Sequence, residues 1–461
     1  MARVVPGVEF KVEFEVVPRS LYPAGVIAMI GTAAKGDLGV PKTVTSYKEL
    51  VEIFGPESSE YTLVKDGKMA FLNSAYQLVA IRVASSLGSR ASAIFKGKRK
   101  VDAVKISAKN PGTDGNGIKV VVLAGKSENT VRIEISGDNI QPETFDDLVM
   151  NKDSENYLVN VLNSNSKFVM AETLIPDPNP DAHNPTAAEE TLTGGSNASL
   201  SAKDYENALA LLESEEHVEF VTACGEARPE VHALIDAHCE KMSLGKEPNA
   251  LSPRIGIGTV GQNESVDQIV SRTSTLASDR FVLVAPFGFA AAVGGLLSKL
   301  DYYESPTFKA ISGISEFGRR YTPSEQMKLV SNGILTLDSI RGRGIVILKG
   351  ITTSRDVQQL SVKRIANRAV MEVKNIADGF IGRLNNYSTR LALKERITES
   401  LIRMERDGAI VPSTDMTKPS FLVDVYSTKD DFAQGRVNAD IAVRPVRAID
   451  YIYGTVSIQA Y

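Results

Sequence analysis

The chain has 461 residues, of which 43% are hydrophobic and 23% are charged, and its formal net charge is −4. This length allows two or three domains with a substantial core, and the composition is ordinary for a soluble globular protein. A general nucleic-acid binder would be markedly basic, so the net charge argues against that class. The two cysteines give no disulfide framework, and no apolar run is long enough to span a membrane.

The first residues, 1–14, lack the long apolar segment of a signal peptide. We therefore expect a chain that is made in a reducing cytoplasm, is not exported by the usual route and does not insert directly into a membrane.

A strand-like segment, VEFKVEFEV at 8–16, lies close to the N-terminus. Charged residues alternate there with apolar ones, which are Val8, Phe10, Val12, Phe14 and Val16. Strict alternation is typical of a strand with one buried and one solvated face. Chain ends fray unless they are tied down, so this strand needs a partner.

The next part of the chain begins a core domain. Apolar runs at 26–30 and 78–83 predict buried strands. A helix is expected over 46–55, with Ser46 as its N-cap and Gly55 as its stop.

The pattern changes at about residue 92. Short alternating segments separated by Gly, Pro and Asn run from 92 to 136 and predict an inserted β-rich domain. Residues 175–197 contain four prolines and two adjacent glycines, so we expect an exposed loop there.

Helices and strands alternate from residue 201 onwards, which favours a largely parallel sheet covered by helices. A strand pair is expected over 341–354, long helices over 357–382 and 389–409, and strands again over 421–461. The predicted fold class is α/β (α+β overall). It comprises a core α/β domain with helices packed on a mixed sheet, an inserted β-rich domain, and extended N- and C-terminal strand arms.

Motifs that carry chemistry are weak in this chain. GTAAKGD at 31–37 has the glycine spacing of a phosphate-binding loop, but Asp37 stands where the lysine is needed. GTVGQNES at 258–265 lacks the full dinucleotide-binding pattern. A zinc site has four candidate ligands without motif spacing, namely Cys224, His232, His238 and Cys239. We expect no catalytic residue, no cofactor and no metal.

Positive charge collects late in the chain. Residues 361–406 hold ten Lys or Arg and five acidic residues, a local excess of five. This is either a solvated helical face or a surface that docks against an acidic partner.

The C-terminal end has the same strand-like alternation as the N-terminal end. Val456, Ile458 and Ala460 alternate there with polar residues. Two strand-like ends stand outside the α/β core. They either pair within their own subunit or add to the sheet edge of a neighbour through main-chain hydrogen bonds. Two such arms can link a subunit to several neighbours and build an open lattice.

Five segments in the same order resemble the tail sheath proteins of contractile phage tails and related contractile injection systems. The similar segments are PGV at 6–8, GTAAKGDLGVPKTVTSYKELVEIFG at 31–55, AKNPGTDGNGIKVVV at 108–122, LTGGSN at 192–197 and GRVNADIAVRPVRAIDYIYGTVSI at 435–458. The chain departs from the family pattern at Asp114, where an aromatic residue is common, and over 341–356.

The resemblance implies a structural subunit without a catalytic site. It implies a helical homo-oligomer of stacked six-fold rings around a tail tube, with tube, baseplate and tail terminator proteins as partners and no nucleic acid. Contraction from a metastable extended state would drive the tube through a cell envelope. The location would be a virion tail assembled in a host cytoplasm or a cell-derived contractile particle, and the sequence does not distinguish the two.

Residue roles follow from the same resemblance. The expected divisions are 1–20 for the N-terminal arm, 21–91 and 198–434 for the core, 92–197 for the outer domain and 435–461 for the C-terminal arm. Hinges are expected at Pro18, Arg19 and Pro445. The candidates for basic residues that face the tube are Arg383, Arg390, Lys394, Arg396 and Arg403.

Two other classes of protein stay open at this point. A soluble α/β enzyme with an unrecognised small-molecule site would be a compact particle, and it leaves both terminal strands unexplained. Another self-assembling lattice protein would share the logic of the arms but not the ordered segments.

Overall fold

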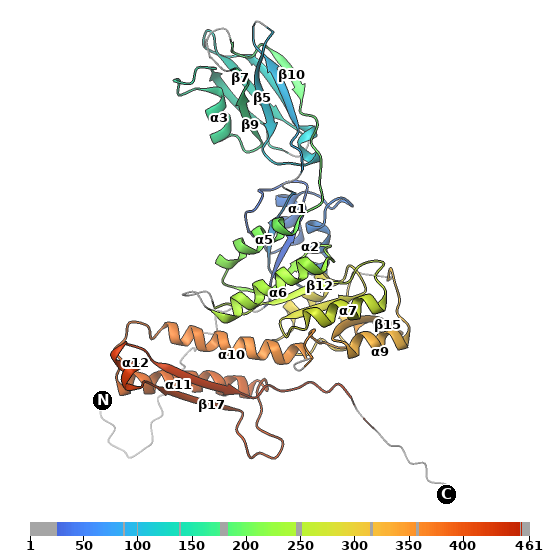
Figure 1. Cartoon of the computed structure of the whole chain (residues 1–461), viewed down its shortest axis with the longest axis vertical. Helices are drawn as coiled ribbons and strands as arrows, with labels where there is room; N and C mark the ends of the chain where they lie inside the picture. Colours follow the sequence, from blue (N-terminus) through green and yellow to red (C-terminus); the bar gives the residue numbers. More distant parts are fainter. Residues whose placement is uncertain are drawn as a thin grey trace, which may run out of the picture.

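The structure is a computed structural model in which the chain forms three tiers along its longest axis (Figure 1). A β-rich domain lies at one end, an α/β core lies in the middle, and helices with a β-hairpin cross the other end. The described residues are 25–85, 88–98, 100–137, 140–175, 183–245, 251–313, 317–355, 359–451 and 453.

A nine-stranded sheet forms the centre of the core, in the order β14-β16-β15-β13-β12-β11-β1-β3-β2. The strands from β15 to β3 in this order run parallel, whereas β16, β14 and β2 pair antiparallel at the two edges. The expected mixed sheet is therefore confirmed. Strand bounds are β1 Val26–Gly31, β2 Lys42–Val44, β3 Leu78–Arg82, β11 Val218–Ala223, β12 Ile255–Thr259, β13 Phe281–Ala285, β14 Ala310–Ile311, β15 Ile334–Ile340 and β16 Gly344–Ile347.

Helices cover both faces of this sheet because successive strand residues point to opposite sides. In β1, Ile27 and Met29 pack with one set of helices, and Ala28 and Ile30 pack with the other. The first set is α1 Tyr47–Phe54, α2 Leu63–Leu72 and α8 Ala290–Lys299. The second set is α5 Ala202–Leu211, α6 Pro229–Leu244, α7 Val266–Leu276 and α9 Pro323–Ser331.

Sequence signals located α1, α5, α6 and α7, but not α2, α8 or α9. Ser46 accepts a hydrogen bond from the Glu49 amide at 3.2 Å and caps α1, and Gly55 ends that helix as expected. Helix α8 is buried on nearly all sides, so its sequence AAAVGGLLSK carries no polar face and no helical period.

The β-rich domain consists of two sheets around a core of their own that includes Phe95, Ile106, Val120 and Ile133. The expected loop at 175–197 is partly wrong, because four of its residues form β10 and pair with β6. Polar side chains suit that position, since β10 is an edge strand. The elements are β4 Ser92–Lys96, β5 Asp102–Ala108, η1 Thr113–Gly117, β6 Lys119–Ala124, β7 Val131–Ser136, β8 Glu143–Leu148, α3 Leu158–Asn165, β9 Val169–Thr173 and β10 Ala188–Thr191.

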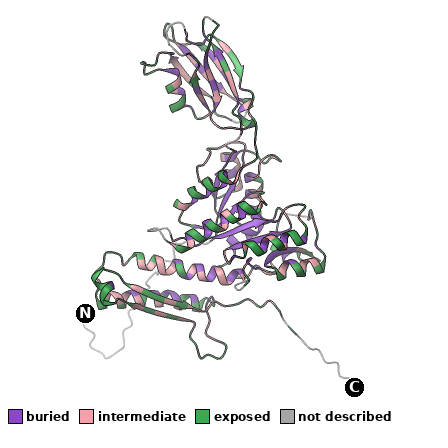
Figure 2. Cartoon of the chain, in the orientation of Figure 1, coloured by how far each residue is buried: buried purple, intermediate pink, exposed green. Residues whose placement is uncertain are grey.

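The third tier, here called the C-terminal layer, covers residues 360–443. It contains α10 Leu360–Asp378, α11 Tyr387–Arg406, β17 Phe421–Tyr426, α12 Lys429–Ala433 and β18 Asn438–Val443. Its small core is centred on Ile397 and Leu401, and Figure 2 shows much more exposed surface here than in the central sheet. Strand β18 pairs with β17 inside this layer, so residues 438–443 do not belong to a separate arm.

The expected N-terminal arm, 1–20, lies outside the described residues, as do residues 452 and 454–461 of the expected C-terminal arm. The arm and hinge candidates that fall outside the description are Val8, Phe10, Val12, Phe14, Val16, Pro18, Arg19, Val456, Ile458 and Ala460. Within the described ranges, no helix is both long and apolar enough for a membrane crossing.

Candidate functional site

The β17–β18 hairpin is a two-stranded sheet with both of its outer edges open within the described chain. The two strands pair only with each other, so each leaves one edge without a strand among the described residues. Their inner face packs on the C-terminal layer through Phe421, Val423, Val425 and Ile441. Free main-chain groups along a strand edge are a template for strand addition.

A second exposed feature lies where α10 turns into α11. Ile381, Leu384 and Tyr387 are 83%, 79% and 74% exposed. Contiguous exposed apolar patches are typical of interaction sites, so this turn is a candidate contact surface. Sequence reasoning missed them, although apolar residues inside a Gly- and Asn-containing turn between two long helices are a usable signal.

The five candidate tube-facing residues do not form one patch. Lys394 pairs with Asp424 of β17 at 3.5 Å, and Arg390 donates to the Asn385 side chain at 2.7 Å. An α-helix turns by about 100° per residue, so 396 and 403 project from a different flank of α11 than 390 and 394.

The other flank is the exposed one. Arg396 and Arg403 both pair with Glu399, at 3.3 and 3.6 Å, and both are exposed. Arg383 is also exposed and lies over the Phe380 ring, 4.4 Å from its centroid. Of the five candidates, Arg383, Arg396 and Arg403 are therefore the exposed residues, and Arg396 and Arg403 share Glu399 as their partner.

Four more basic residues of this region are held by acidic partners within the chain. The pairs are Lys363–Asp279, Arg364–Glu219, Arg368–Glu372 and Lys374–Asp378. Glu372 and Asp378 are already among the five acidic residues of this region, so the four pairs offset two of its five excess positive charges, through Asp279 and Glu219.

Pro445 does not have the surroundings of a hinge. It forms an antiparallel bridge with Ile410, and its neighbours Arg444 and Val446 are bonded to the segment before it through Val411 and Ala409. A residue held on both sides by a main-chain ladder cannot absorb a large rotation. Main-chain bonds thus hold Pro445 on both sides in this structure, and the hinge at this position stays a prediction.

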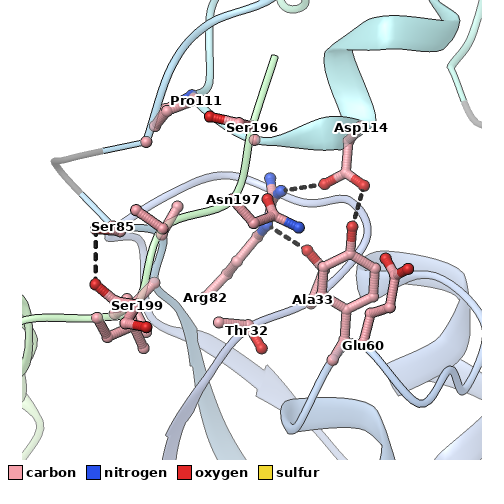
Figure 3. A pocket seen from close by; sticks show the side chains of 17 residues that line it. Thr32, Ala33, Glu60, Arg82, Ser85, Pro111, Asp114, Ser196, Asn197 and Ser199 are labelled. Atoms are coloured by element: carbon pink, nitrogen blue, oxygen red, sulfur yellow. Dashed lines mark hydrogen bonds and ion pairs between the residues drawn. The ribbon is translucent and has the colours of Figure 1, made fainter.

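The junction between the core and the β-rich domain centres on Arg82, at the end of β3 (Figure 3). Its guanidinium donates to the Ala33 and Gly36 carbonyl oxygens at 2.9 and 2.8 Å, and pairs with Asp114 of the β-rich domain at 2.9 Å. The Tyr61 hydroxyl donates to the other oxygen of the same carboxylate. Asp114, the departure from the family pattern, thus connects the β-rich domain to two residues of the core.

This junction borders a cavity of about 180 Å³ and is the natural place to look for a small-molecule site. Burial raises the pKa of Asp114, and its charge is matched by Arg82. Glu60, Ser196 and Asn197 also line the cavity, but no histidine, lysine or cysteine does so among the described residues. The arrangement fixes one domain against the other, and it presents no nucleophile beside a histidine base.

The four candidate zinc ligands are spread through the core. His232 lies between the Glu226 carbonyl and Arg272, at 3.2 and 3.1 Å, and His238 accepts from Arg254 at 2.8 Å. Burial lowers the pKa of His232 to about 4 and that of His238 to about 3, and the neighbouring arginines act in the same direction. No group of three or more possible metal ligands forms within the described ranges.

Comparison with known proteins identifies a family profile that matches the middle of the chain. Residues 198–353 match the family profile of the phage tail sheath protein central domain. The chain contains a tail sheath central domain. The resemblance inferred from the sequence segments is therefore confirmed.

The likeness to sheath proteins extends beyond that domain. The tail sheath protein of Bacillus phage SP01 is 22% identical over an alignment of 246 residues that covers 48% of this chain and 40% of that protein. The match thus spans well under two thirds of that relative.

Solved structures show that the sheath fold covers nearly the whole chain. The sheath tail protein of Desulfitobacterium hafniense matches with a TM-score of 0.61 at 14% identity, covering 96% of this chain and all of that one. The helical sheath of the anti-feeding prophage in its contracted state matches with a TM-score of 0.56 at 12% identity, over 99% of both chains.

Proposed function

We propose that this chain is a structural subunit of a contractile tail sheath and not an enzyme. The observation that carries the proposal is the sheath fold over almost the full length of the chain. Stacked six-fold rings of the subunit would surround a tail tube, between a baseplate and a tail terminator. Contraction from a metastable extended state would drive the tube through a cell envelope, in a phage tail or in a cell-derived contractile particle.

In this proposal the terminal strands connect neighbouring subunits. The β17–β18 hairpin offers two open edges, and the chain has two strand-like ends, at 8–16 and 456–460. Addition of a neighbour's strand to each edge would satisfy the main-chain groups of both partners. Main-chain ladders suit a contracting lattice because they hold while the rest of each subunit rotates as a rigid body.

Deleting residues 1–17 should abolish the assembly of cylinders. The deletion removes the alternating segment and leaves the described fold, from residue 25 onwards, intact. Negative-stain electron microscopy of the purified full-length chain and the truncated chain measures the effect. We expect cylinders from the first and discrete particles from the second.

Two outcomes of that comparison would contradict the proposal. Monomers from both chains at high concentration would count against a sheath and favour the enzyme alternative. Cylinders from both would keep the sheath but show that the N-terminal strand is not the link between subunits.

The grip on the tube is the second part of the proposal. Exposed Arg383, Arg396 and Arg403 would face an acidic tube surface in the extended state. An exposed charge pair contributes roughly 0–1 kcal/mol. Many weak contacts of this kind suit a surface that must release when the sheath contracts.

Reversing Arg396 and Arg403 to glutamate should sharply reduce assembly of the sheath on tubes without unfolding α11. A matched control reverses Arg341 and Arg343, which are exposed in the turn between β15 and β16 and give the same change in net charge. Co-sedimentation with purified tubes measures binding, and circular dichroism checks the fold. Equal assembly by the two variants would refute this role of α11.

A further inference from the structure

Both terminal segments leave the described fold beside the start of the same helix, α10. The first described residue is Gly25, and the last ones are Tyr451 and Tyr453. Side chains at the start of α10 connect to the chain at both of these points.

The main chain of Gly25 is held on two sides. Its N–H donates to the Glu219 carboxylate at 2.6 Å, and its carbonyl accepts from the Ser298 hydroxyl. Its φ of +86° is unfavourable for other residues, and a Cβ there would lie 2.5 Å from the Ser298 carbonyl oxygen. The root of the N-terminal segment is therefore fixed in position.

Glu219 bonds Gly25 and also bonds Arg364 of α10. Its other carboxylate oxygen accepts from Nε of Arg364 at 2.7 Å, and the Arg364 side chain is fully buried. The same guanidinium donates to the Leu300 and Asp301 carbonyl oxygens, at 3.2 and 3.1 Å. Hydrogen bonds between charged partners are among the strongest in proteins.

The C-terminal segment is tied to the residue at the start of the same helix. The Gln359 side chain accepts from the Ala448 N–H at 3.1 Å and donates to the Ala448 carbonyl at 3.0 Å and to Asp450 at 2.9 Å. Lys349 adds an ion pair to Asp450 at 3.4 Å and a contact of 3.3 Å with the Tyr451 hydroxyl.

We infer that the start of α10 is a joint that passes force from one terminal arm to the other. Gln359 and Arg364 are five residues apart, or about 7.5 Å along a helix. Tension on one arm reaches the other through Glu219, Arg364 and Gln359. The inference rests on the proposed role of the arms as links between subunits.

The position of this joint explains how a lattice can stay connected while its subunits rotate. Force that enters a subunit through one terminal arm can reach the other arm by a short path at the edge of the core. The β-rich domain lies at the opposite end of the molecule (Figure 1), away from this path.

Pulling the full-length chain by its two ends in an optical trap tests the joint without any need for assembly. Replacing Gln359 by alanine removes three hydrogen bonds to the C-terminal segment. Glu219→Gln weakens the link between Gly25 and Arg364. For each variant we expect the first extension step at constant force to occur about tenfold faster than in the wild type.

Two control variants separate this role from general stability. Gln268→Ala removes the hydrogen bond that the Gln268 side chain accepts from the Ser265 N–H at the start of α7. This helix start makes no bond to either terminal segment among the hydrogen bonds described above. Asp279→Asn breaks the ion pair to Lys363 in the first turn of α10. It removes no bond to Gly25 or to the C-terminal segment. For both controls we expect the first extension step to occur at the wild-type rate.

The inferred joint would be overturned if the first extension step of Gln359→Ala and Glu219→Gln occurred at a rate within twofold of the wild type. It would also be overturned if the two control variants accelerated that step equally. Failure of the sheath itself gives a different result. In that case electron microscopy of the wild-type chain shows no cylinders. The force measurement still reports whether Gly25 and the C-terminal segment are connected through α10.

Discussion

Replacing Arg364 by methionine should lower the free energy of unfolding of α10 by about 3–5 kcal/mol. The change leaves the Glu219 carboxylate, only 13% exposed, without its cationic partner. It also removes the donors to the Leu300 and Asp301 carbonyl oxygens. A buried charge that loses its partner is far more costly than the intact pair is stabilising.

Hydrogen exchange of the α10 amides measures this effect because it reports on one element of a chain that has several domains. The matched control is the double replacement Glu219→Leu with Arg364→Met. Since the charge is then absent, at least half of the lost stability should return. A cost below about 1 kcal/mol for Arg364→Met alone would show that water reaches Glu219 and that the pair is not a buried anchor.

Local signals in the sequence predicted much of the core. Ser46 and Gly55 mark the ends of α1 because capping depends on one residue at each end. The long helices α10 and α11 were also correctly located. Helix α8 and strand β10 were missed for opposite reasons, because α8 has no polar face and β10 has almost no apolar residues.

Surface roles were harder to predict than the fold because they depend on contacts between distant parts of the chain. Lys394 and Arg396 look equivalent in sequence, yet Lys394 faces Asp424 in a strand thirty residues later. Arg364 looks like one more surface charge, yet it is fully buried against Glu219. Spacing along a helix shows which residues share a flank, but not which flank another element covers.

Asp114 illustrates the same limit. In the sequence it is only a departure from a pattern in which an aromatic residue is common. In the structure it receives bonds from Arg82 and Tyr61, both contributed by the core. An aromatic side chain at this position could pack against the core but could not pair with Arg82. The aspartate therefore adds a charged contact between the β-rich domain and the core.

The last prediction concerns Asp66, in the first turn of α2. Replacing it by asparagine should stabilise the folded chain at pH 7 by up to about 3 kcal/mol. The Asp66 carboxylate accepts a hydrogen bond from the Gly225 N–H at 2.8 Å. Burial nevertheless raises the pKa of Asp66 from 3.8 to about 6, since that one bond and nearby Lys65 compensate only in part.

The sign of the effect follows from proton binding. With its pKa raised on folding, Asp66 binds a proton more tightly in the folded chain than in the unfolded one. Its contribution to stability is therefore full below about pH 4 and is lost as the pH rises through about 6. Above that pH the folded state holds a partly buried charge at a cost. Asparagine can accept the same bond from Gly225 without that charge.

Urea unfolding of the wild type and Asp66→Asn at several pH values measures the difference. The variant should be the more stable protein at pH 7 and 8, and the two should converge near pH 4. Asp267→Asn is a matched control, because Asp267 also lies in the first turn of a core helix but has a largely exposed side chain. A variant at Asp66 that is less stable than the wild type at pH 8 would show that the carboxylate is needed as a charged partner of the Gly225 N–H, which would reverse the sign argued here.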